Sequence, residues 1–454
     1  MMRLSEAANV LQGRLIGLDM VFTSVGTDSR NIAQGQLFVA LKGPHFDGHH
    51  FAAEAIKQGA AAVLVDNPEL GVEPAIVVQD TRLALGQLAA YWRSQFNIPV
   101  VAVTGSNGKT TTKEMLTAIL SEAAGGTDKV HSTYGNLNND IGLPLTLLKM
   151  NARHQYAVIE MGMNHLGEIE YLTHIAKPNV AVINNAGTAH IGELGSRDNI
   201  AKAKGEIFAG LDANGIAVIN ADDEYAEYWE TLNSERKVVT FGLNLGADIT
   251  ASFKEEDGFS SVNLTTPSGK VSFKLNVQGQ HNISNALAAG ATAYALGVSN
   301  TNIAQGLQSF AGVYGRLERK AGVNGAIVID DTYNANPDSM KAAIDVLAQQ
   351  DGEKILVLGD MGELGTDALT MHMEIGTYAK VAGLSTLYCL GELSQAMVNG
   401  FGVGKGESAG AKHFNSVEAI VEAILPQMKQ GVTVLVKGSR FMKMERVVRL
   451  LVNQ

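Results

Sequence analysis

The chain has one cysteine among 454 residues, Cys389. A single cysteine cannot form an intrachain disulfide, which excludes a disulfide-stapled domain. Cys389 lies in the apolar run 387–390, so we expect it to be a buried core residue. Proline is also scarce, at 9 residues against 49 glycines, and this balance favours tight turns between strands and helices over flexible linkers.

Long apolar runs are missing as well. No stretch reaches the roughly 18 apolar residues of a membrane-spanning helix, and the N-terminus lacks the apolar segment of a signal peptide. Basic residues are outnumbered, with 35 Lys and Arg against 46 Asp and Glu and a formal net charge of −11, which disfavours a nonspecific nucleic-acid binder. We therefore expect a soluble, cytoplasmic protein without a membrane span or a nucleic-acid partner. We also expect it to be a monomer.

What the sequence does contain is a regular alternation of short apolar segments with helical patterns, which predicts an α/β fold with largely parallel sheets. The length predicts about three domains, and weak boundary signals place them at 1–84, 85–313 and 314–454. The stretch 247–277 alternates without a helix around a Pro-Ser-Gly turn, so we expect an antiparallel meander inserted in the central domain. The expected strands include 61–65, 100–104, 158–161, 180–184, 216–220, 327–330, 355–358 and 432–436, and the expected helices 109–123, 199–209, 283–296, 338–348 and 443–451.

The strongest local motif is VVAVTGSNGKTTT at 100–112, a strand followed by a glycine-rich turn and a helix. Backbone N–H groups and a helix N-terminus converge in such a turn and can bind phosphate. Lys109 would reach the β- and γ-phosphates of a nucleotide, and the Thr110 hydroxyl would bind Mg²⁺. The full P-loop spacing requires glycine where this chain has Val103, so the loop is a shortened variant. The alternative is an ordinary strand–helix turn; the predicted nucleotide-binding residues are Gly105, Ser106, Asn107, Gly108, Lys109, Thr110 and Thr111.

Other polar residues follow predicted strands. Glu160 ends one strand and His190 follows another, and ligands of open α/β sheets gather at the carboxyl ends of strands. A carboxylate in that place suits Mg²⁺, although a solvent-facing acid and a structural histidine remain the plainer alternatives. Lys202 and Lys204 stand two residues apart on a helix and therefore do not share a face. One of them can face inward, unless both are solvated.

Two further segments look like ligand-binding edges. Asn282 and Asn285 open a helix, where an amide either caps the helix or bonds the edge of a base. Residues 330–339, DDTYNANPDS, place two acids at a strand end and Pro337 in the first turn of a helix. Arg316 lies shortly before that segment, in the string GRLE.

Together these motifs resemble the Mur ligase family, the ATP-dependent amide ligases of peptidoglycan precursor synthesis, from one end of the chain to the other. The strings GNLNNDIG, DDTYNANPDS and GDMGELG are typical of members that join D-alanyl-D-alanine to UDP-N-acetylmuramoyl-tripeptide. The DNPR motif of members that add meso-diaminopimelate is missing from the last domain, and DNPE at 66–69 is taken as chance. Further matching strings are TDSR at 27–30, LFVALKG at 37–43, FDGH at 46–49, KAKGEIF at 202–208, HNISNA at 281–286 and KGSR at 437–440.

The resemblance implies an ATP site with two Mg²⁺ ions. Lys109 and Thr110 would hold the ATP phosphates and the first Mg²⁺, and Glu160 and His190 the second. Lys204 fits the family pattern of a lysine that is carbamylated, which turns a cation into an oxygen ligand. The implied catalytic residues are Lys109, Lys204, His190 and Arg316. In the nucleotide site, Asn282 would contact the adenine, Asp331 the ribose and Arg316 the γ-phosphate, and Asn285 is a further nucleotide-binding residue.

The resemblance also implies where the other substrates bind. Ser29, Arg30, Asp47 and Gly48 resemble the pocket for the UDP-sugar. The remaining implied substrate contacts are Asn138, Asn139, Tyr333 and Asn334, with His372 and the KGSR string as weaker candidates.

The implied reaction begins when a substrate carboxylate attacks the γ-phosphate of ATP to give an acyl phosphate, and the dipeptide amine then displaces phosphate. We expect the third domain to close onto the second when the substrates are bound. Two alternatives stay open. A folylpolyglutamate synthase-like ligase would share the loop and metal site but not the DSR and FVALKG strings of the first domain. A nucleotide-hydrolysing switch or regulatory protein would have no need of a third α/β domain.

Overall fold

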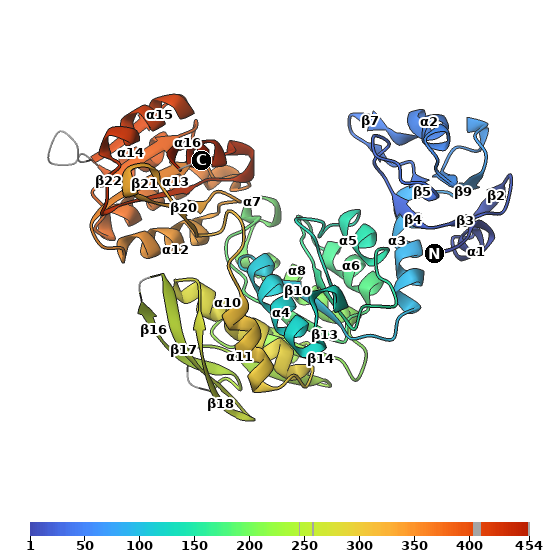
Figure 1. Ribbon diagram of the computed structural model, residues 1–454, viewed down its shortest axis with the longest axis horizontal. Coiled ribbons are helices and arrows are strands. Elements are labelled where there is room, and N and C mark those ends of the chain that lie inside the picture. Colours follow the sequence, from blue (N-terminus) through green and yellow to red (C-terminus); the bar gives the residue numbers. More distant parts are fainter. Residues whose placement is uncertain (245, 257, 403–409, 453–454) are drawn as a thin grey trace.

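The computed structural model describes residues 1–244, 246–256, 258–402 and 410–452. Three α/β domains follow one another along the chain, and the N-terminal and C-terminal domains stand at opposite ends of the central domain (Figure 1). Within the described ranges, every helix is too short or too polar to cross a lipid bilayer.

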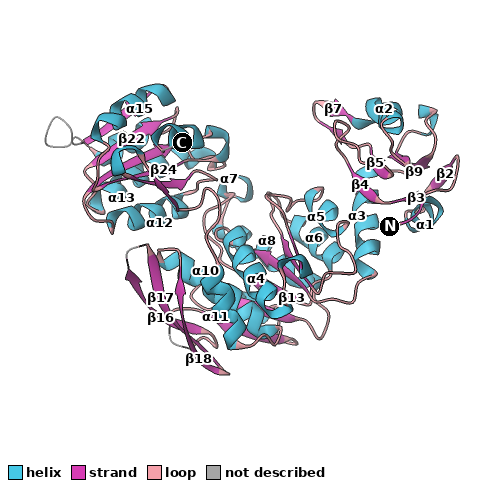
Figure 2. Ribbon diagram, in the orientation of Figure 1, coloured by secondary structure: helices cyan, strands magenta, loops and turns pink. Residues whose placement is uncertain are grey.

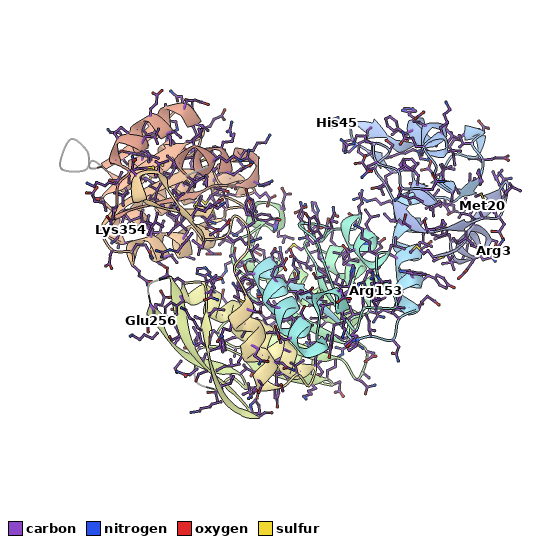
Figure 3. The ribbon with its side chains drawn as sticks, viewed as in Figure 1. Arg3, Met20, His45, Arg153, Glu256 and Lys354 are labelled. Carbon is purple, nitrogen blue, oxygen red and sulfur yellow. The ribbon has the colours of Figure 1, made fainter. Side chains whose placement is uncertain are left out.

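The N-terminal domain is built on a five-stranded sheet whose strands are parallel except at one edge. Its order is β2 (Arg14–Ile16), β9 (Ala75–Val77), β8 (Ala62–Val65), β5 (Gln36–Val39) and β4 (Ser24–Gly26), with β2 antiparallel to β9. Two small antiparallel pairs flank it, β1 (Met2–Arg3) with β3 (Val21–Phe22) and β6 (Lys42–Gly43) with β7 (Phe46–Asp47). His45, in the turn between β6 and β7, lies on the side turned toward the C-terminal domain (Figure 3). The helices are α1 (Leu4–Val10), η1 (Gly48–Phe51), α2 (Ala52–Lys57) and η2 (Pro68–Leu70).

Helix α3 (Thr81–Ser94) joins the first domain to the second. Asp80 is its N-cap, and the Asp80 side chain accepts hydrogen bonds from the amides of Arg82 and Leu83. Its buried face belongs to one continuous apolar core, which also contains side chains of the first domain and of one face of the central sheet. The predicted boundary at residue 84 therefore falls inside a helix that both domains share.

The central domain has a six-stranded, fully parallel sheet. Apolar helices cover both faces, which explains why its strands are apolar throughout rather than alternating. The strand order is β11 (Val130–Ser132), β12 (Tyr156–Glu160), β10 (Val100–Thr104), β13 (Val180–Ile183), β14 (Ile216–Asn220) and β15 (Lys237–Phe241). The helices are α4 (Lys109–Ala124), η3 (Thr127–Lys129), α5 (Gly142–Leu147), α6 (Glu168–Ala176), α7 (Ile191–Leu194), α8 (Arg197–Gly205), η4 (Glu206–Gly210), α9 (Ala226–Thr231), α10 (Gln280–Ala295) and α11 (Asn300–Ser309).

The predicted meander is confirmed. Strands β16 (Thr250–Glu256), β17 (Phe259–Thr266) and β18 (Gly269–Leu275) pair antiparallel in sequence order. Figure 2 shows these three strands without a helix between them, at the edge of the central domain beside α10 and α11. Their inward-facing side chains, such as Val262, Leu264 and Phe273, join the core under α10.

The C-terminal domain has a second six-stranded sheet, parallel except for its first strand. The order is β19 (Glu318–Ala321), β20 (Ile327–Asp331), β24 (Val432–Lys437), β21 (Glu353–Gly359), β22 (Thr386–Leu390) and β23 (Gly410–Phe414). Cys389 is buried in β22, as predicted. The helices are η5 (Val323–Gly325), α12 (Pro337–Ala348), η6 (Gly365–Asp367), α13 (Ala368–Val381), α14 (Gln395–Phe401), α15 (Val417–Ile424), η7 (Leu425–Gln427), η8 (Arg440–Met442) and α16 (Glu445–Leu451).

The expected strands and helices named in the sequence analysis are confirmed, with ends that differ by a few residues. The largest difference lies at 199–209, where α8 ends at Gly205 and a tighter 3-10 turn, η4, follows.

Candidate active site

The phosphate-binding motif lies between β10 and α4, at the carboxyl edge of the central sheet. Gly108 has a φ of 78°, and a Cβ there would come within 2.0 Å of Asn285 Oδ1, so only glycine fits. Lys109 Nζ donates to Gly105 O at 2.7 Å, and the Ser106 hydroxyl accepts the amide of Gly187 at 2.9 Å. Burial lowers the pKa of Lys109, against the opposing charge of Glu160.

Two asparagines that follow β13 hold this loop in shape. Asn185 Oδ1 accepts the amide of Asn107 at 2.9 Å, and Asn185 Nδ2 donates to Asn107 O at 3.2 Å. Asn184 Nδ2 donates to Thr112 Oγ1 at 2.8 Å. Sequence reasoning assigned no role to Asn184 or Asn185; their place directly after an apolar strand was the signal for them.

Glu160 is the last residue of β12 and is 2% exposed. Its Oε1 accepts Asn138 Nδ2 at 2.8 Å, whereas Oε2 is buried and has no hydrogen-bond partner in the described residues. A buried carboxylate oxygen without a partner is costly, so the site fits a cation. The neighbouring Asn139 accepts the amide of Gly142, the first residue of α5, with its Oδ1 at 2.8 Å.

His190 is the N-cap of α7, has a φ of 64° and contacts Glu363 of the C-terminal domain. Its Nδ1 lies 2.8 Å from Glu363 Oε2, and this contact lowers the pKa of Glu363. The described residues contain no group of three or more His, Cys, Asp or Glu side chains placed to hold a metal ion. A metal at the predicted set would thus depend on the Thr110 hydroxyl and on Lys204 as well as on Glu160 and His190.

The two lysines of α8 are in different environments. Lys202 is exposed, whereas Lys204 is 1% exposed and makes no hydrogen bond or ion pair within the described part of the chain. Burial lowers the pKa of Lys204 well below its ordinary value, and the charge of Lys109 lowers it further. Lys204 is therefore the inward-facing lysine of the pair.

The C-terminal domain contributes Arg316 and Asp331. Arg316 Nη2 donates to Thr110 Oγ1 at 3.1 Å, and its guanidinium lies 4.3 Å from the centre of the Tyr333 ring. Asp331, at the end of β20, accepts Lys437 Nζ at 2.6 Å. Burial raises the pKa of Asp331, while the Lys437 charge opposes the rise.

Three contacts at the start of α12 join the C-terminal domain to the central domain. Asn336 Nδ2 donates to Asn107 Oδ1 in the phosphate loop at 2.8 Å. Asp338 Oδ2 accepts both the amide and the hydroxyl of Thr188, at 2.7 and 2.9 Å. Sequence reasoning had marked the motif that contains Asn336 and Asp338, but had assigned neither residue a role.

The side chains of Asn282 and His372 are buried and form hydrogen bonds with the protein backbone. Asn282 is 6% exposed and its Nδ2 donates to Gln278 O at 2.8 Å. His372 is fully buried; its Nε2 accepts the amide of Met361 at 3.0 Å, and its Nδ1 lies 2.6 Å from Ala368 O. Because both ring nitrogens are engaged, His372 supports the loop 359–365 rather than offering a free group to a ligand.

The predicted UDP-sugar residues lie in the N-terminal domain, apart from the phosphate loop (Figure 1). Arg30 is 87% exposed and pairs with both carboxylate oxygens of Asp28 at 2.8 Å, which lowers the pKa of Asp28 to about 2. Asp47 Oδ1 accepts the amide of His49 at 2.9 Å, and Gly48 packs where a Cβ would come within 2.8 Å of the Leu41 backbone. Ser29, partly buried, lies between Asp28 and Arg30.

A pair of charged residues connects this domain to the loop that carries Asn138. Arg82, in the first turn of α3, forms a bidentate contact with Asp140, with Nη2 at 2.9 Å from Oδ1. The loop 133–141 thus contacts both Arg82 at the N-terminal end of α3 and the side chain of Glu160.

Comparison with known proteins identifies the family of all three parts. Residues 21–93 match the model for the catalytic domain of the Mur ligase family, residues 103–293 the Mur ligase middle domain, and residues 315–440 the Mur ligase, glutamate ligase domain. UDP-N-acetylmuramoyl-tripeptide–D-alanyl-D-alanine ligase of Escherichia coli strain K12 is 43% identical over 453 residues, 99% of this chain and 98% of that protein.

Solved structures of related proteins are similar to this chain over nearly its whole length. The crystal structure of MurF from Acinetobacter baumannii has a TM-score of 0.90 at 38% identity and covers 98% of this chain and 97% of that one. The MurF ligase of Thermotoga maritima in complex with ADP has a TM-score of 0.83 at 30% identity, over 94% of this chain and 96% of that one.

Proposed function

This chain belongs to the Mur ligase family, and we propose that it joins D-alanyl-D-alanine to UDP-N-acetylmuramoyl-tripeptide with the hydrolysis of ATP to ADP and phosphate. The end-to-end similarity to ligases of that name carries the proposal. It favours this reaction over that of a folylpolyglutamate synthase-like enzyme or a nucleotide-hydrolysing switch. ATP is the nucleotide, in keeping with the ADP complex of the Thermotoga maritima relative.

The phosphate loop holds the triphosphate. Lys109 exchanges its bond to Gly105 O for phosphate oxygens, and the amides at the start of α4, a helix end that no described side chain caps, bind the same group. Arg316 lies beside Thr110 and meets the γ-phosphate, with its guanidinium supported by the Tyr333 ring. Asn282, Asn285 and Asp331 contact the nucleoside.

The chemistry proceeds in two displacements. A carboxylate oxygen of the tripeptide forms a bond to the γ-phosphorus, and the bond from that phosphorus to the β-phosphate bridging oxygen breaks to release ADP. The dipeptide amine then forms a bond to the acyl carbon, loses a proton, and phosphate leaves. Lys109 and Arg316 stabilise the negative charge that gathers on the transferred phosphoryl group.

Two Mg²⁺ ions are part of the proposal. Thr110 would hold one, and Glu160 and His190 the other; the unpartnered Oε2 of Glu160 suits a hard cation. When bound, Mg²⁺ screens the charge of the phosphates and orients them.

We also propose that Lys204 is carbamylated. Burial and Lys109 lower the pKa of Lys204, which favours the neutral amine that attacks CO₂. The amine nitrogen bonds the carbon of CO₂ and releases a proton, and a buried neutral amine without a hydrogen-bond partner among the described residues becomes an anion with two oxygen ligands. That anion would lie near Lys109 and would complete the ligand set around the metal.

The N-terminal residues 1–84, with Ser29, Arg30, Asp47 and Gly48, take the UDP-sugar end of the substrate, and the exposed guanidinium of Arg30 suits a diphosphate. Residues 85–313 bind ATP, and residues 314–454 receive the dipeptide, with Tyr333 and Asn334 at the junction and Asn138 and Asn139 near the tripeptide. We place the enzyme in the cytoplasm, as a monomer, in the cell-wall synthesis on which cell shape and division depend.

The test is phosphate release from ATP and Mg²⁺ in the presence of UDP-N-acetylmuramoyl-tripeptide, with and without D-alanyl-D-alanine. Release that requires both substrates supports the proposal. Release that ignores the dipeptide, or that a single amino acid supports equally well, contradicts it, and release without either substrate would point to the nucleotide switch.

A further inference from the structure

Lys113 is buried on α4, four residues after Lys109, and has no part in the roles described above. Its side chain is 1% exposed; Nζ donates to Thr133 O at 2.8 Å and pairs with the carboxylate of Glu114. Burying an ammonium group is costly, and an apolar side chain of similar volume often serves packing as well or better. The charge therefore calls for an explanation other than packing.

The polar groups of Thr133 are all engaged, and they connect Lys113 to Glu160. Thr133 directly follows β11 and is 1% exposed. Its amide donates to Val158 O at 3.0 Å, its carbonyl accepts Lys113, and its hydroxyl accepts the amide of Glu160 at 2.9 Å. A shift of Thr133 would therefore move the end of β12 at the point where Glu160 emerges.

The loop that starts at Thr133 also reaches the Glu160 side chain. Asn138, five residues further on, donates to Glu160 Oε1, and its carbonyl accepts the amide of Gly162 at 2.9 Å. The loop thus forms hydrogen bonds with the amides of Glu160 and Gly162 and with one oxygen of the Glu160 carboxylate. The other oxygen, Oε2, stays without a partner among the described residues.

We propose that Lys113 is a positioning residue for Glu160, an inference that rests on the proposed function because it concerns the carboxylate that would hold Mg²⁺ there. The ammonium group fixes the carbonyl of Thr133, and the Thr133 hydroxyl then fixes the amide of Glu160. Asn138 turns the carboxylate so that one oxygen is left for the cation. Lys113 itself touches neither the nucleotide nor the reacting atoms.

The central variant is Lys113→Met, which keeps the aliphatic stem in the core and removes the donor. Its matched control is Lys129→Met, because Lys129 Nζ also donates to a backbone carbonyl of α4, Ala124 O at 2.8 Å, at the far end of the helix. Hydrogen exchange of the Glu160 amide is measured in the ligand-free chain, with the Ala102 amide of the neighbouring strand β10 as the internal reference. The second measurement is the Mg²⁺ concentration that gives half-maximal phosphate release.

We expect Lys113→Met to speed exchange at Glu160 relative to Ala102, and to raise the half-maximal Mg²⁺ concentration, each by about tenfold, the size expected from one lost hydrogen bond to a charged group. The KM for D-alanyl-D-alanine should stay unchanged, and Lys129→Met should behave as wild type. Thr133→Val should give the same pattern without touching Lys113, and the double variant should show less than the product of the two single effects, because both act on one amide.

The proposal is overturned if Lys113→Met matches Lys129→Met in both measurements, or if exchange at Glu160 and Ala102 speeds up equally, since equal acceleration reports general destabilisation. If Lys113→Met fails to fold, Thr133→Val decides the matter by the same two criteria. A wild-type chain that releases no phosphate with both substrates would refute the proposed function, whereas the exchange measurement would still report whether Lys113 positions Glu160.

Discussion

Replacing Asp338 with alanine should release the C-terminal domain from its contact with the central domain. One carboxylate oxygen, Asp338 Oδ2, accepts both polar hydrogens that Thr188 offers, at 2.7 and 2.9 Å. His190, the proposed metal ligand, follows Thr188 by two residues. The contact therefore ties the position of the C-terminal domain to the loop that would carry His190.

The size of the effect follows from the two bonds. A hydrogen bond to a charged group contributes about 1.5–3 kcal/mol, and because both bonds share one oxygen at a half-buried interface we take the sum as about 2–3 kcal/mol. That energy changes the ratio of docked to undocked molecules by about 30- to 150-fold. Asp338 also lies in the first turn of α12, where an acidic side chain adds about 0.3–1 kcal/mol to the helix itself.

The assay combines kcat with small-angle scattering in the presence of ATP and Mg²⁺. Asp338→Ala should lower kcat and enlarge the radius of gyration, while Asp338→Asn, which keeps an accepting oxygen without the charge, should fall between Asp338→Ala and wild type. Asp367→Ala is the control, because Asp367 is an exposed acid at the start of α13, in the same domain. If Asp338→Ala matches Asp367→Ala in both kcat and scattering, the contact with Thr188 does not hold the domains together.

Three further predictions concern Lys204, the domain-linking ion pair and a buried histidine. Protein equilibrated with ¹³C-labelled CO₂ should show a carbamate resonance that Lys204→Met abolishes and Lys202→Met leaves in place; a signal in both variants would refute the assignment. Reversing one charge of the Arg82–Asp140 pair should lower the melting temperature, and reversing both charges should restore it. As for other half-exposed pairs, we expect a coupling energy of about 0.5–1 kcal/mol, which added salt reduces. If the double reversal restores nothing, the pair does not contribute to stability. Burial lowers the pKa of His131 from its ordinary 6.5 to about 4. As the pH falls, the unfolded chain therefore binds a proton at His131 before the folded chain does. The free energy of unfolding should thus be highest above pH 6.5 and should decrease as the pH falls toward about 4. In His131→Gln, the melting temperature should depend less on pH between about 6.5 and 4 than in the wild type. An unchanged pH dependence would contradict this prediction.

The phosphate loop could be predicted from sequence because its signals are local. An apolar strand, two glycines with special backbone requirements and a helix start occur within 13 residues, and the structure reproduces each of them. Lys204 could be favoured over Lys202 only by the family pattern, and burial now separates the two side chains.

Other features depend on residues that are distant in sequence. Asn139 belongs to the string GNLNNDIG, which does not show that its Oδ1 accepts the amide of Gly142. In the same way, the sequence around His372 does not show that its ring accepts the amide of Met361. From its sequence context alone, Lys113 is expected to be a solvated lysine on a helix. Only the structure shows that its Nζ donates to the carbonyl of Thr133, twenty residues away. Sequence patterns cannot supply such pairs, because nothing in the spacing says which carbonyl a lysine will meet.

Helix α3 has a consequence for protein engineering. Trp92 Nε1 donates to Met150 O at 3.0 Å and Arg93 Nε to Ala176 O at 3.0 Å, so the end of the helix is bonded into the central domain while its start adjoins the first. A chimera that exchanges the N-terminal domain between two such enzymes must therefore keep α3 whole, with its junction after residue 94 in the short connection to β10. It must also carry matched surroundings for Arg82, Trp92 and Arg93 in the central domain. A graft cut at residue 84 would instead divide the helix itself between the two parents.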